Sequence, residues 1–312
     1  MGGIGIVNNP RSRRNRRLPD TGARLAHLLD GEGEVADAAT LAELDEVLGR
    51  FEARGIDTLG VNGGDGTAHV VLTAAARRWP RLPRLLLLRG GAMNTVAHGH
   101  RLHGTPEAIL ERYLERRRNG HGPRLVERDL LRVEAPGLEP RCGFIFGTGA
   151  VVAFLDAYYR TGLPVPTTAA ALLGRAILSA LARGKFAARL TAREGLRVLA
   201  DGEEWPDDRY LAVMAASVPE IGFGFTPFAR CAEQPGFFHA VGVTGSVLQV
   251  VARLPAIFAG RPWSRAVAMD AVSRELVLEG PGPIRFTLDG DLYAAEGRLT
   301  VSTGPAVEVV VV

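Results

Sequence analysis

One short segment combines glycines, a carboxylate and a hydroxyl: the run GGDGT at residues 63–67, between an apolar run that ends at Val61 and a helical pattern over 68–79. The first turn of a helix has unpaired backbone N–H groups at the positive end of its dipole, so it favours an anion. Glycines let phosphate oxygens approach the backbone, and Thr67 is placed to cap the helix or to donate to phosphate. Asp65 would repel a phosphate unless Mg²⁺ lay between them. The segment predicts a phosphate-binding loop, with an ordinary strand-to-helix turn as the alternative.

Alternating strand and helix signals surround this loop and would position it. Apolar runs typical of strands cover residues 3–9, 33–39, 56–61 and 84–90. Helical patterns cover residues 21–30, 40–55, 68–79 and 105–118. In residues 40–55 the apolar side chains follow the i, i+3, i+4, i+7 spacing of one helix face. Repeated strand–helix units of this length predict an α/β domain with a Rossmann-like, doubly wound parallel sheet.

The pattern changes from about residue 124 onward. Short strand-like runs follow, separated by glycine, proline and aspartate: 124–136, 141–149, 186–192, 196–205, 209–217, 237–245, 274–280, 284–293 and 298–312. Strands without intervening helices predict an antiparallel β-sandwich, with a helical insertion near 167–184. We therefore expect two domains, 1–122 and 123–312, with the last strand as a candidate to return to the first domain.

The composition is that of an ordinary folded protein. The chain has 312 residues, of which 46% are hydrophobic and 23% charged, enough for two domains with their own cores. A formal net charge of +3 is too small to indicate nucleic-acid binding, and none is expected. Cys142 and Cys231 lie far apart in no metal-like spacing, which fits a reducing compartment. No signal peptide and no run of ~18 apolar residues is evident, so we expect a cytoplasmic protein with at most peripheral contact at the inner membrane face.

Three further patches have more than one interpretation. Five arginines in RSRRNRR, residues 11–17, suit ATP phosphates, an anionic membrane surface, nucleic acid or plain solvation. Their place after the first strand favours phosphates or lipid headgroups over nucleic acid. His98, His100 and His103 match no metal-site spacing that we recognise. The apolar face of helix 167–184 indicates core packing or, alternatively, a lipid entrance or a surface at the bilayer interface.

The GGDGT run also matches the signature of the diacylglycerol-kinase-type lipid kinases, whose superfamily includes sphingosine kinases, NAD kinases and phosphofructokinases. Three more segments resemble this family: NPRS at 9–12 resembles its NPxSG element, LLRGGAMNTVA at 87–97 its PxGTxNDxA segment, and FTLDGDLY at 286–293 its late DGE segment. The resemblance spans nearly the whole chain. It implies an amino-terminal domain that binds ATP with Mg²⁺ and a carboxy-terminal domain that holds a diacylglycerol-like lipid.

The resemblance also implies roles for single residues. The ATP phosphates would bind at Gly63, Gly64, Asp65, Gly66 and Thr67, and Asn8 or Asn9, Thr40 and Asn94 would support the nucleotide. Asp291 would deprotonate the lipid hydroxyl, which makes Asp291 and Asp65 the catalytic candidates. A plain hairpin turn at residues 289–291 is the alternative, because Asp-Gly between two strand-like runs is a strong hairpin signal.

The sequence departs from the family at several of these places. After the glycine run, His69 and Val70 stand where the family has Asn and Glu, and Ala92 and Thr95 replace the Thr and Asp of PxGTxNDxA. No glycine follows NPRS, and Asp291 replaces a Glu. Pro235-Gly236 replaces an Asp-Gly that helps many bacterial members bind a structural Mg²⁺. These departures leave two alternatives to lipid kinase activity. One is a catalytically weak or inactive nucleotide- or lipid-binding homologue, and the other is a soluble-substrate kinase of the NAD-kinase side.

Overall fold

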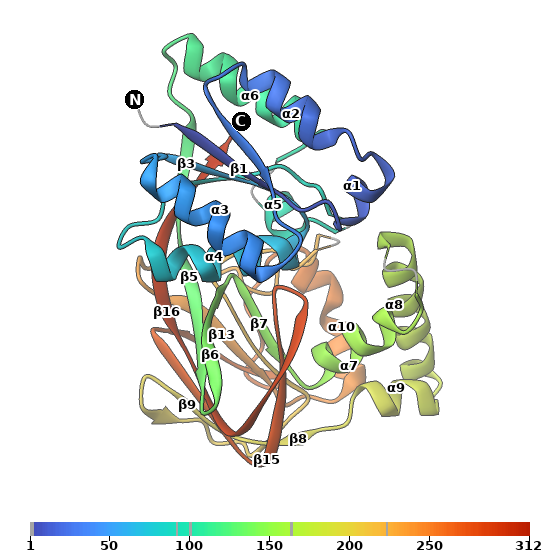
Figure 1. Cartoon of the computed structure of the whole chain (residues 1–312). Helices are drawn as coiled ribbons and strands as arrows, with labels where there is room; N and C mark the ends of the chain where they lie inside the picture. Colours follow the sequence, from blue (N-terminus) through green and yellow to red (C-terminus); the bar gives the residue numbers. More distant parts are fainter. Residues whose placement is uncertain (1–2, 92, 100–101, 163–164, 223) are drawn as a thin grey trace. The chain divides into compact units, whose positions relative to one another are not determined.

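The computed structural model describes residues 3–91, 93–99, 102–162, 165–222 and 224–312, so Ala92 and His100 lie outside the described residues. The chain divides into two compact units (Figure 1): Met1–Arg128 with Pro305–Val312, and Asp129–Gly304. Within the described ranges, no helix combines the length and the apolar character needed to cross a bilayer.

Parallel strands form the centre of the first unit. They are β1 (Ile4–Asn8), β2 (Gly33–Asp37), β3 (Thr58–Asn62) and β4 (Arg84–Leu87), in the order β2-β1-β3-β4. Every residue of β1 and β3 is buried, as expected for strands covered on both faces. The end of β16 (Asp291–Val311) adds a parallel strand beside β4, with Val309 paired to Leu85. The order is that of a doubly wound sheet, which confirms the predicted α/β class.

Helices cover both faces of this sheet (Figure 1). They are α1 (Arg13–Arg17), α2 (Thr21–Leu29), α3 (Leu41–Ala53), α4 (Asp65–Arg78), α5 (Thr95–Gly99) and α6 (Pro106–Arg118). Ile4 and Ile6 share a core with α2 and α6, whereas Gly5 faces Phe51 of α3. Because successive residues of a strand point to opposite faces, α3 and its neighbour α4 cover the other side.

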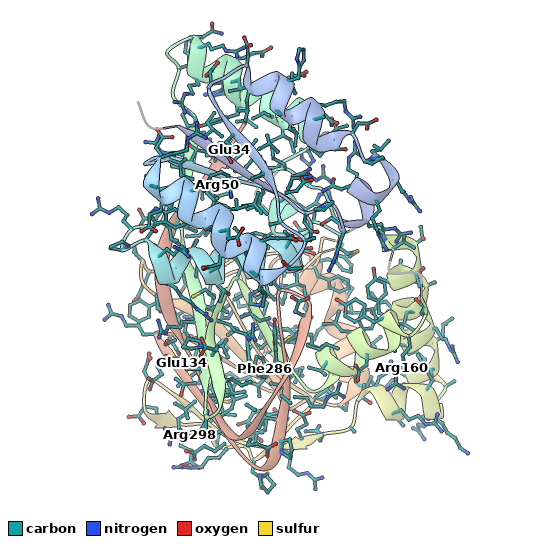
Figure 2. The ribbon with its side chains drawn as sticks, viewed as in Figure 1. Glu34, Arg50, Glu134, Arg160, Phe286 and Arg298 are labelled. Atoms are coloured by element: carbon teal, nitrogen blue, oxygen red, sulfur yellow. The ribbon has the colours of Figure 1, made fainter. Side chains whose placement is uncertain are left out.

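Antiparallel strands form the second unit, as predicted. The longer ones are β6 (Leu138–Gly143), β7 (Ile145–Thr148), β9 (Arg197–Ala200), β12 (Ala212–Ala216), β13 (Phe238–Val243), β14 (Ala268–Ser273) and β15 (Glu275–Leu288). Parts of β5 (Arg124–Ala135) and β16 join them. The short strands are β8 (Glu194–Gly195), β10 (Glu203–Glu204) and β11 (Arg209–Tyr210). The central order is β14-β13-β12-β7-β15-β16. Strand β15 pairs with β9 through its first half and with β7 through its second half, so its side chains, including Phe286 (Figure 2), join those of β7 and β9 in one core.

Four helices accompany these strands: α7 (Ala150–Tyr159), α8 (Pro166–Leu181), α9 (Lys185–Leu190) and α10 (Val247–Phe258). The strand predicted at 186–192 is wrong, because α9 occupies most of it; its Ala, Arg and Leu residues are strong helix formers and Gly184 precedes the first turn. The two runs predicted at 274–280 and 284–293 are joined, since β15 continues through both up to Leu288. Helix α10 was not predicted, although Ser246 and Gln249 form a capping box at its start.

Candidate functional site

Three parallel strands end at one level, where a buried asparagine network joins them. The register pairs Asn8 with Asp37 and with Asn62. Asn8 Nδ2 donates to Asp37 Oδ1 at 2.6 Å, and Asn8 Oδ1 accepts from Asn62 Nδ2 at 2.7 Å. Asn15 of α1 donates to Asn8 Oδ1 at 3.2 Å and to the backbone oxygens of Asn9 and Asn62 at 2.8 and 3.1 Å. The network therefore fixes α1 and the strand ends against one another.

Asn8 was predicted from the sequence, whereas its partners Asn15, Asp37 and Asn62 were not. Asn8, Asn15 and Asn62 are each at most 3% exposed, so their amides serve the protein interior. A signal for Asn62 was present, since a polar residue follows the apolar run 59–61 immediately before the glycine run. Asn15 is the one uncharged residue among residues 13–17, which was a second signal.

Asn9 and Thr67 connect the end of β1 to the start of α4. Asn9 Nδ2 donates to Thr67 Oγ1 at 2.9 Å, and Ser12 Oγ lies 3.4 Å from the same oxygen. Asn9 Oδ1 accepts from the backbone N–H of Arg11 at 2.9 Å. The structure thus brings Asn9 together with the glycine run, while nucleotide binding by these residues stays a prediction.

The glycine run packs directly against a second glycine loop, residues 89–94. A Cβ on Gly91 would lie 2.2 Å from Cα of Gly64, and a Cβ on Gly90 would lie 2.9 Å from the backbone N of Gly63. The Gly90 oxygen also accepts from the backbone N–H of Arg14 at 3.2 Å. The sequence analysis assigned glycine here to the approach of a ligand. In the structure, residue 91 has no room for a side chain, because its Cβ would meet the backbone of Gly64, whereas a Cβ on residue 64 would be in tight contact with Gly91.

Asp65 holds this second loop through the first turn of α5. Its Oδ2 accepts from the backbone N–H of Thr95 at 2.9 Å, and its Oδ1 accepts from that of Val96 at 3.1 Å. Burial raises the pKa of the Asp65 carboxyl, although these two backbone donors act in the opposite direction. Both carboxylate oxygens are therefore engaged within the protein.

The raised pKa of Asp65 predicts how stability depends on pH. The folded protein binds a proton at Asp65 more readily than the unfolded chain does. The contribution of this protonation to the free energy of unfolding is therefore fully present below the ordinary pKa of 3.8. It is lost as the pH rises through the raised value, and a tenfold difference in proton affinity between the folded and unfolded states corresponds to about 1.4 kcal/mol. We expect the unfolding free energy of the wild type, relative to Asp65→Asn, to fall with rising pH in urea titrations. A difference that stays constant or grows with pH would contradict the assignment.

The start of α4 leaves a cluster of backbone donors open to an anion. The described residues give the N–H groups of Asp65, Gly66 and Thr67 no hydrogen-bond acceptor. Two basic side chains add positive charge nearby: Arg14, whose backbone bonds to the second loop, and Arg89, which belongs to that loop. Burial lowers the pKa of the Arg89 guanidinium, and the charge of Arg14 lowers it further. This edge of the sheet can therefore bind a multiply charged anion.

Arg89 is a candidate that the sequence analysis did not name. Its φ of 54° is in the left-handed region, and its Nη2 lies 2.7 Å from Nε2 of His98. It stands at the first position of the segment that resembles PxGTxNDxA, where the family has proline. The His98 and His103 rings meet edge to face with centroids 6.2 Å apart, a packing contact without the geometry of a metal site.

Thr40 and Asn94 both have structural partners. Thr40 is exposed and caps α3, accepting from the backbone N–H of Glu43 at 3.2 Å in a capping box. Asn94 is 8% exposed and has a φ of 51°. Its Oδ1 accepts from the Gly91 N–H at 3.0 Å, and its Nδ2 donates to the Gly91 oxygen at 3.2 Å. Asn94 therefore shapes the second glycine loop, while nucleotide contact by either residue stays a prediction.

Asp289 and Asp291 lie in the second unit, on either side of a tight turn. Leu288 of β15 pairs with Asp291 of β16, and the two residues between them, Asp289 and Gly290, have φ values of 50° and 96°. This is the hairpin that the sequence analysis gave as an alternative. The Asp289 carboxylate is 7% exposed and accepts from the backbone N–H groups of Phe144 and Ile145 at 3.0 and 2.8 Å. Asp291 is half-buried at the start of β16.

The side chains that could hold Mg²⁺ are not clustered among the described residues. In the described part of the chain, no group of three His, Cys, Asp or Glu side chains is arranged to hold a metal. Asp65 uses both oxygens on backbone donors. The N–H of Gly236 donates to Asp129 at 2.8 Å and its oxygen accepts from Thr303 at 2.9 Å.

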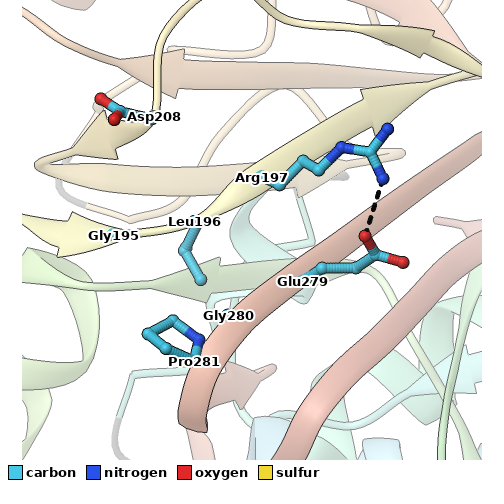
Figure 3. Close-up of a pocket in the computed structure, with 7 residues that line it drawn as sticks. All are labelled: Gly195, Leu196, Arg197, Asp208, Glu279, Gly280 and Pro281. Atoms are coloured by element: carbon cyan, nitrogen blue, oxygen red, sulfur yellow. Dashed lines mark hydrogen bonds and ion pairs between the residues drawn. The ribbon is translucent and has the colours of Figure 1, made fainter.

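A shallow open depression in the second unit contains none of the predicted site residues. It is lined by Gly195, Leu196, Arg197, Asp208, Glu279, Gly280 and Pro281 (Figure 3). Its main charges are already paired, because Arg197 bonds to Glu279 and to Glu204, each at 2.9 Å. We therefore place the candidate site at the glycine loops of the first unit.

Comparison with known proteins finds a family match for most of the first unit and a similar fold for the chain. Residues 4–121 match the family described as the diacylglycerol kinase catalytic domain. The crystal structure of a diacylglycerol kinase from Bacillus anthracis str. Sterne is similar over 99% of this chain and 96% of that chain, with 12% identity and a TM-score of 0.64. Yeast NADH kinase complexed with NADH is similar over 99% of this chain and 83% of that chain, with 10% identity and a TM-score of 0.52. At these identities the likeness establishes the fold. A search of curated proteins found no match.

Proposed function

We propose, from the match of residues 4–121 to the diacylglycerol kinase catalytic domain family, that the chain transfers the γ-phosphate of ATP to the hydroxyl group of a lipid. The family and the kinase fold support a phosphotransferase of the lipid or NAD kinase type. The lipid acceptor, for which a diacylglycerol-like molecule is the first choice, is the finer part of the proposal.

One observation carries the nucleotide part of this proposal. The N–H groups of Asp65, Gly66 and Thr67 have no acceptor in the described structure, and they stand at the positive end of a helix of fourteen residues. Phosphoryl transfer depends mainly on positioning and on neutralising charge, so backbone donors with Arg14 and Arg89 suit the triphosphate. Asn9 and Asn94 would act by shaping the two loops.

The proposed role of Asp65 is to position the glycine loops and not to take a direct part in the reaction. Its carboxylate bonds to Thr95 and Val96, which hold the second glycine loop against the first. We therefore assign Asp65 to positioning. Mg²⁺ would neutralise the phosphates to which it is bound, but the structure offers no carboxylate cluster to hold it, so no step is assigned to the metal.

Asp291 is the proposed general base. A carboxylate can accept the proton of the acceptor hydroxyl as oxygen attacks phosphorus, and a modest base is sufficient for phosphoryl transfer. The chain would act in the cytoplasm, with peripheral contact at the inner membrane face where a lipid acceptor is found. Nucleic acid has no part in this proposal.

A kinase assay separates the proposed function from its alternatives. Purified protein with radiolabelled ATP and Mg²⁺ is incubated with diacylglycerol, monoacylglycerol or a sphingoid base in detergent micelles, and with NAD in parallel. We expect label in one lipid, and none in NAD. Label in NAD alone would reassign the chain to soluble-substrate kinases. ATP binding measured by calorimetry, without label in any acceptor, would identify an inactive homologue.

A further inference from the structure

The large apolar side chains exposed in the second unit are concentrated on three helices. Within its described residues, the exposed large apolar side chains are Tyr159 on α7, Leu178 and Leu181 on α8, and Leu248 and Phe258 on α10. Leu178 is 69% exposed and Leu181 60%. Helix α8 contacts both α7 and α10, so the five residues belong to one helical group (Figure 1). Gathered apolar exposure of this kind marks a surface that contacts a partner or a membrane.

Helix α8 leaves two of its large apolar residues, Leu178 and Leu181, outside the protein core. It has sixteen residues, and its buried ones are Ala169 and Ala180. Helix α10 is similar, because Ile257 is its buried residue among twelve. Core packing, one of the interpretations of helix 167–184 given by the sequence, therefore does not account for Leu178 and Leu181, although Leu172 and Leu173 are half-buried. Two apolar helices that bury so little of their length need another apolar environment.

The charges around these helices are of one sign. Residues 157–193 include six basic residues and no Asp or Glu, and residues 246–269 include three arginines and again no Asp or Glu. Arg160 lies at the end of α7 (Figure 2). Arg175, Arg183 and Arg189 are exposed, and Arg175 stacks on Phe186 at 4.2 Å from the ring centroid. The one carboxylate of α7, Asp156, is neutralised by Arg285 at 2.7 Å.

From these observations we propose that the helical face, defined by Tyr159, Leu178, Leu181, Leu248 and Phe258 with the arginines around them, docks on an anionic lipid bilayer. Helices with exposed apolar residues and basic flanks lie in the membrane interface, where arginine meets lipid phosphate. A bilayer fits this face better than a protein partner because residues 157–193 and 246–269 supply only basic charge, which matches a surface of one sign. The inference rests on the proposed function to the extent that a bilayer would hold the lipid acceptor.

Vesicle binding tests the helical face without any kinase reaction. Protein is sedimented with sucrose-loaded vesicles of phosphatidylcholine containing about 30% phosphatidylglycerol, or of phosphatidylcholine alone. We expect binding to the anionic vesicles that weakens with salt, and much weaker binding to the neutral ones. Leu178→Glu with Leu181→Glu should lower the partition coefficient at least about tenfold, and Arg175→Gln with Arg183→Gln should lower it severalfold.

Leu41→Glu is the matched control, because Leu41 is 71% exposed on α3 of the first unit. It should bind like the wild type, and circular dichroism should show all variants folded. Equal binding by the Leu178→Glu/Leu181→Glu variant and the wild type would overturn the inference. The inference would also be overturned if the wild-type protein bound no vesicles but self-associated, and if the Leu178→Glu/Leu181→Glu variant abolished that self-association. The face would then join two copies of the chain.

The two proposals fail in different ways. Activity on a lipid dispersed in detergent does not require docking, so the Leu178→Glu/Leu181→Glu variant should retain it. If wild-type protein phosphorylates micellar lipid but ignores anionic vesicles, the docking inference fails alone. If it binds vesicles through this face but phosphorylates no lipid, the proposed function fails and the docking surface stands.

Discussion

Replacing Gly91 with alanine is expected to lower nucleotide affinity at least about tenfold and the free energy of unfolding by about 1–3 kcal/mol. The added Cβ would lie 2.2 Å from Cα of Gly64 and 2.9 Å from Oδ1 of Asn94. Because its nearest neighbour is backbone, no side chain can turn aside to make room. The second loop would have to move away from the start of α4.

The effect should be graded among the glycines of the two loops. A Cβ on Gly64 would lie 3.1 Å from Cα of Gly91, a contact that a small adjustment relieves. Gly64→Ala should therefore be milder than Gly91→Ala. A displacement of about 1 Å at a site that works by positioning can lower the rate about a hundredfold, so the kinase rate should respond more strongly than stability.

Gly122→Ala is the control for Gly91→Ala. Nothing lies within 4 Å of the position that its Cβ would take, and its φ is not in the left-handed region. Nucleotide affinity would be measured by calorimetry and stability by urea unfolding for both variants. If Gly91→Ala matched Gly122→Ala in both quantities, the contact between the loops would not be needed for nucleotide binding.

Local sequence signals predicted most of the first unit. The apolar spacing of residues 40–55 marked α3, which spans Leu41–Ala53, because one helix face must be buried against the sheet. The helix predicted from residue 68 begins earlier, at Asp65. The glycine run therefore includes the first turn of α4, where glycine and aspartate give no apolar spacing to detect.

Not all helices of the second unit were predicted. The helix predicted near 167–184 corresponds to α8, whereas α10 was missed. Prediction from apolar spacing assumes that the apolar face is buried, and α10 leaves most of its apolar residues partly exposed. Helix α9 has six residues, too few to display a helical period, so its run of Phe, Ala and Leu was interpreted as a strand.

The candidate site was only partly predictable, because its members are joined across long distances in the sequence. The GGDGT run and Asn9 carry local signals, and the structure brings them together through Thr67. The contact between Gly64 and Gly91, and the bonds from Asp65 to the start of α5, depend on how β3 and β4 pair. No local pattern specifies such contacts, so their assignment required the structure.

Asp291→Asn is expected to lower the rate of phosphoryl transfer by about 10²–10⁴-fold, because an amide cannot accept the proton of the acceptor hydroxyl. Nucleotide affinity should be unchanged, and the free energy of unfolding should change by less than about 1 kcal/mol, since Asp291 is half-buried at a strand end. Asp291→Glu, which restores the family's residue, should retain activity. Initial rates at saturating ATP, with affinity and unfolding measured in parallel, check these expectations.

Asp289, two residues earlier, supplies the contrast that makes this test specific. Its carboxylate accepts from the backbone N–H groups of Phe144 and Ile145, and an amide in its place would turn an N–H₂ group toward one of these donors. Asp289→Asn should therefore lower the free energy of unfolding by about 2–3 kcal/mol, the range for hydrogen bonds to a charged group. The rate of phosphoryl transfer per folded molecule of Asp289→Asn should stay close to that of the wild type. If Asp291→Asn destabilised the protein as much as Asp289→Asn, or left the rate intact, residues 289–291 would be a structural hairpin and the base would have to be sought elsewhere.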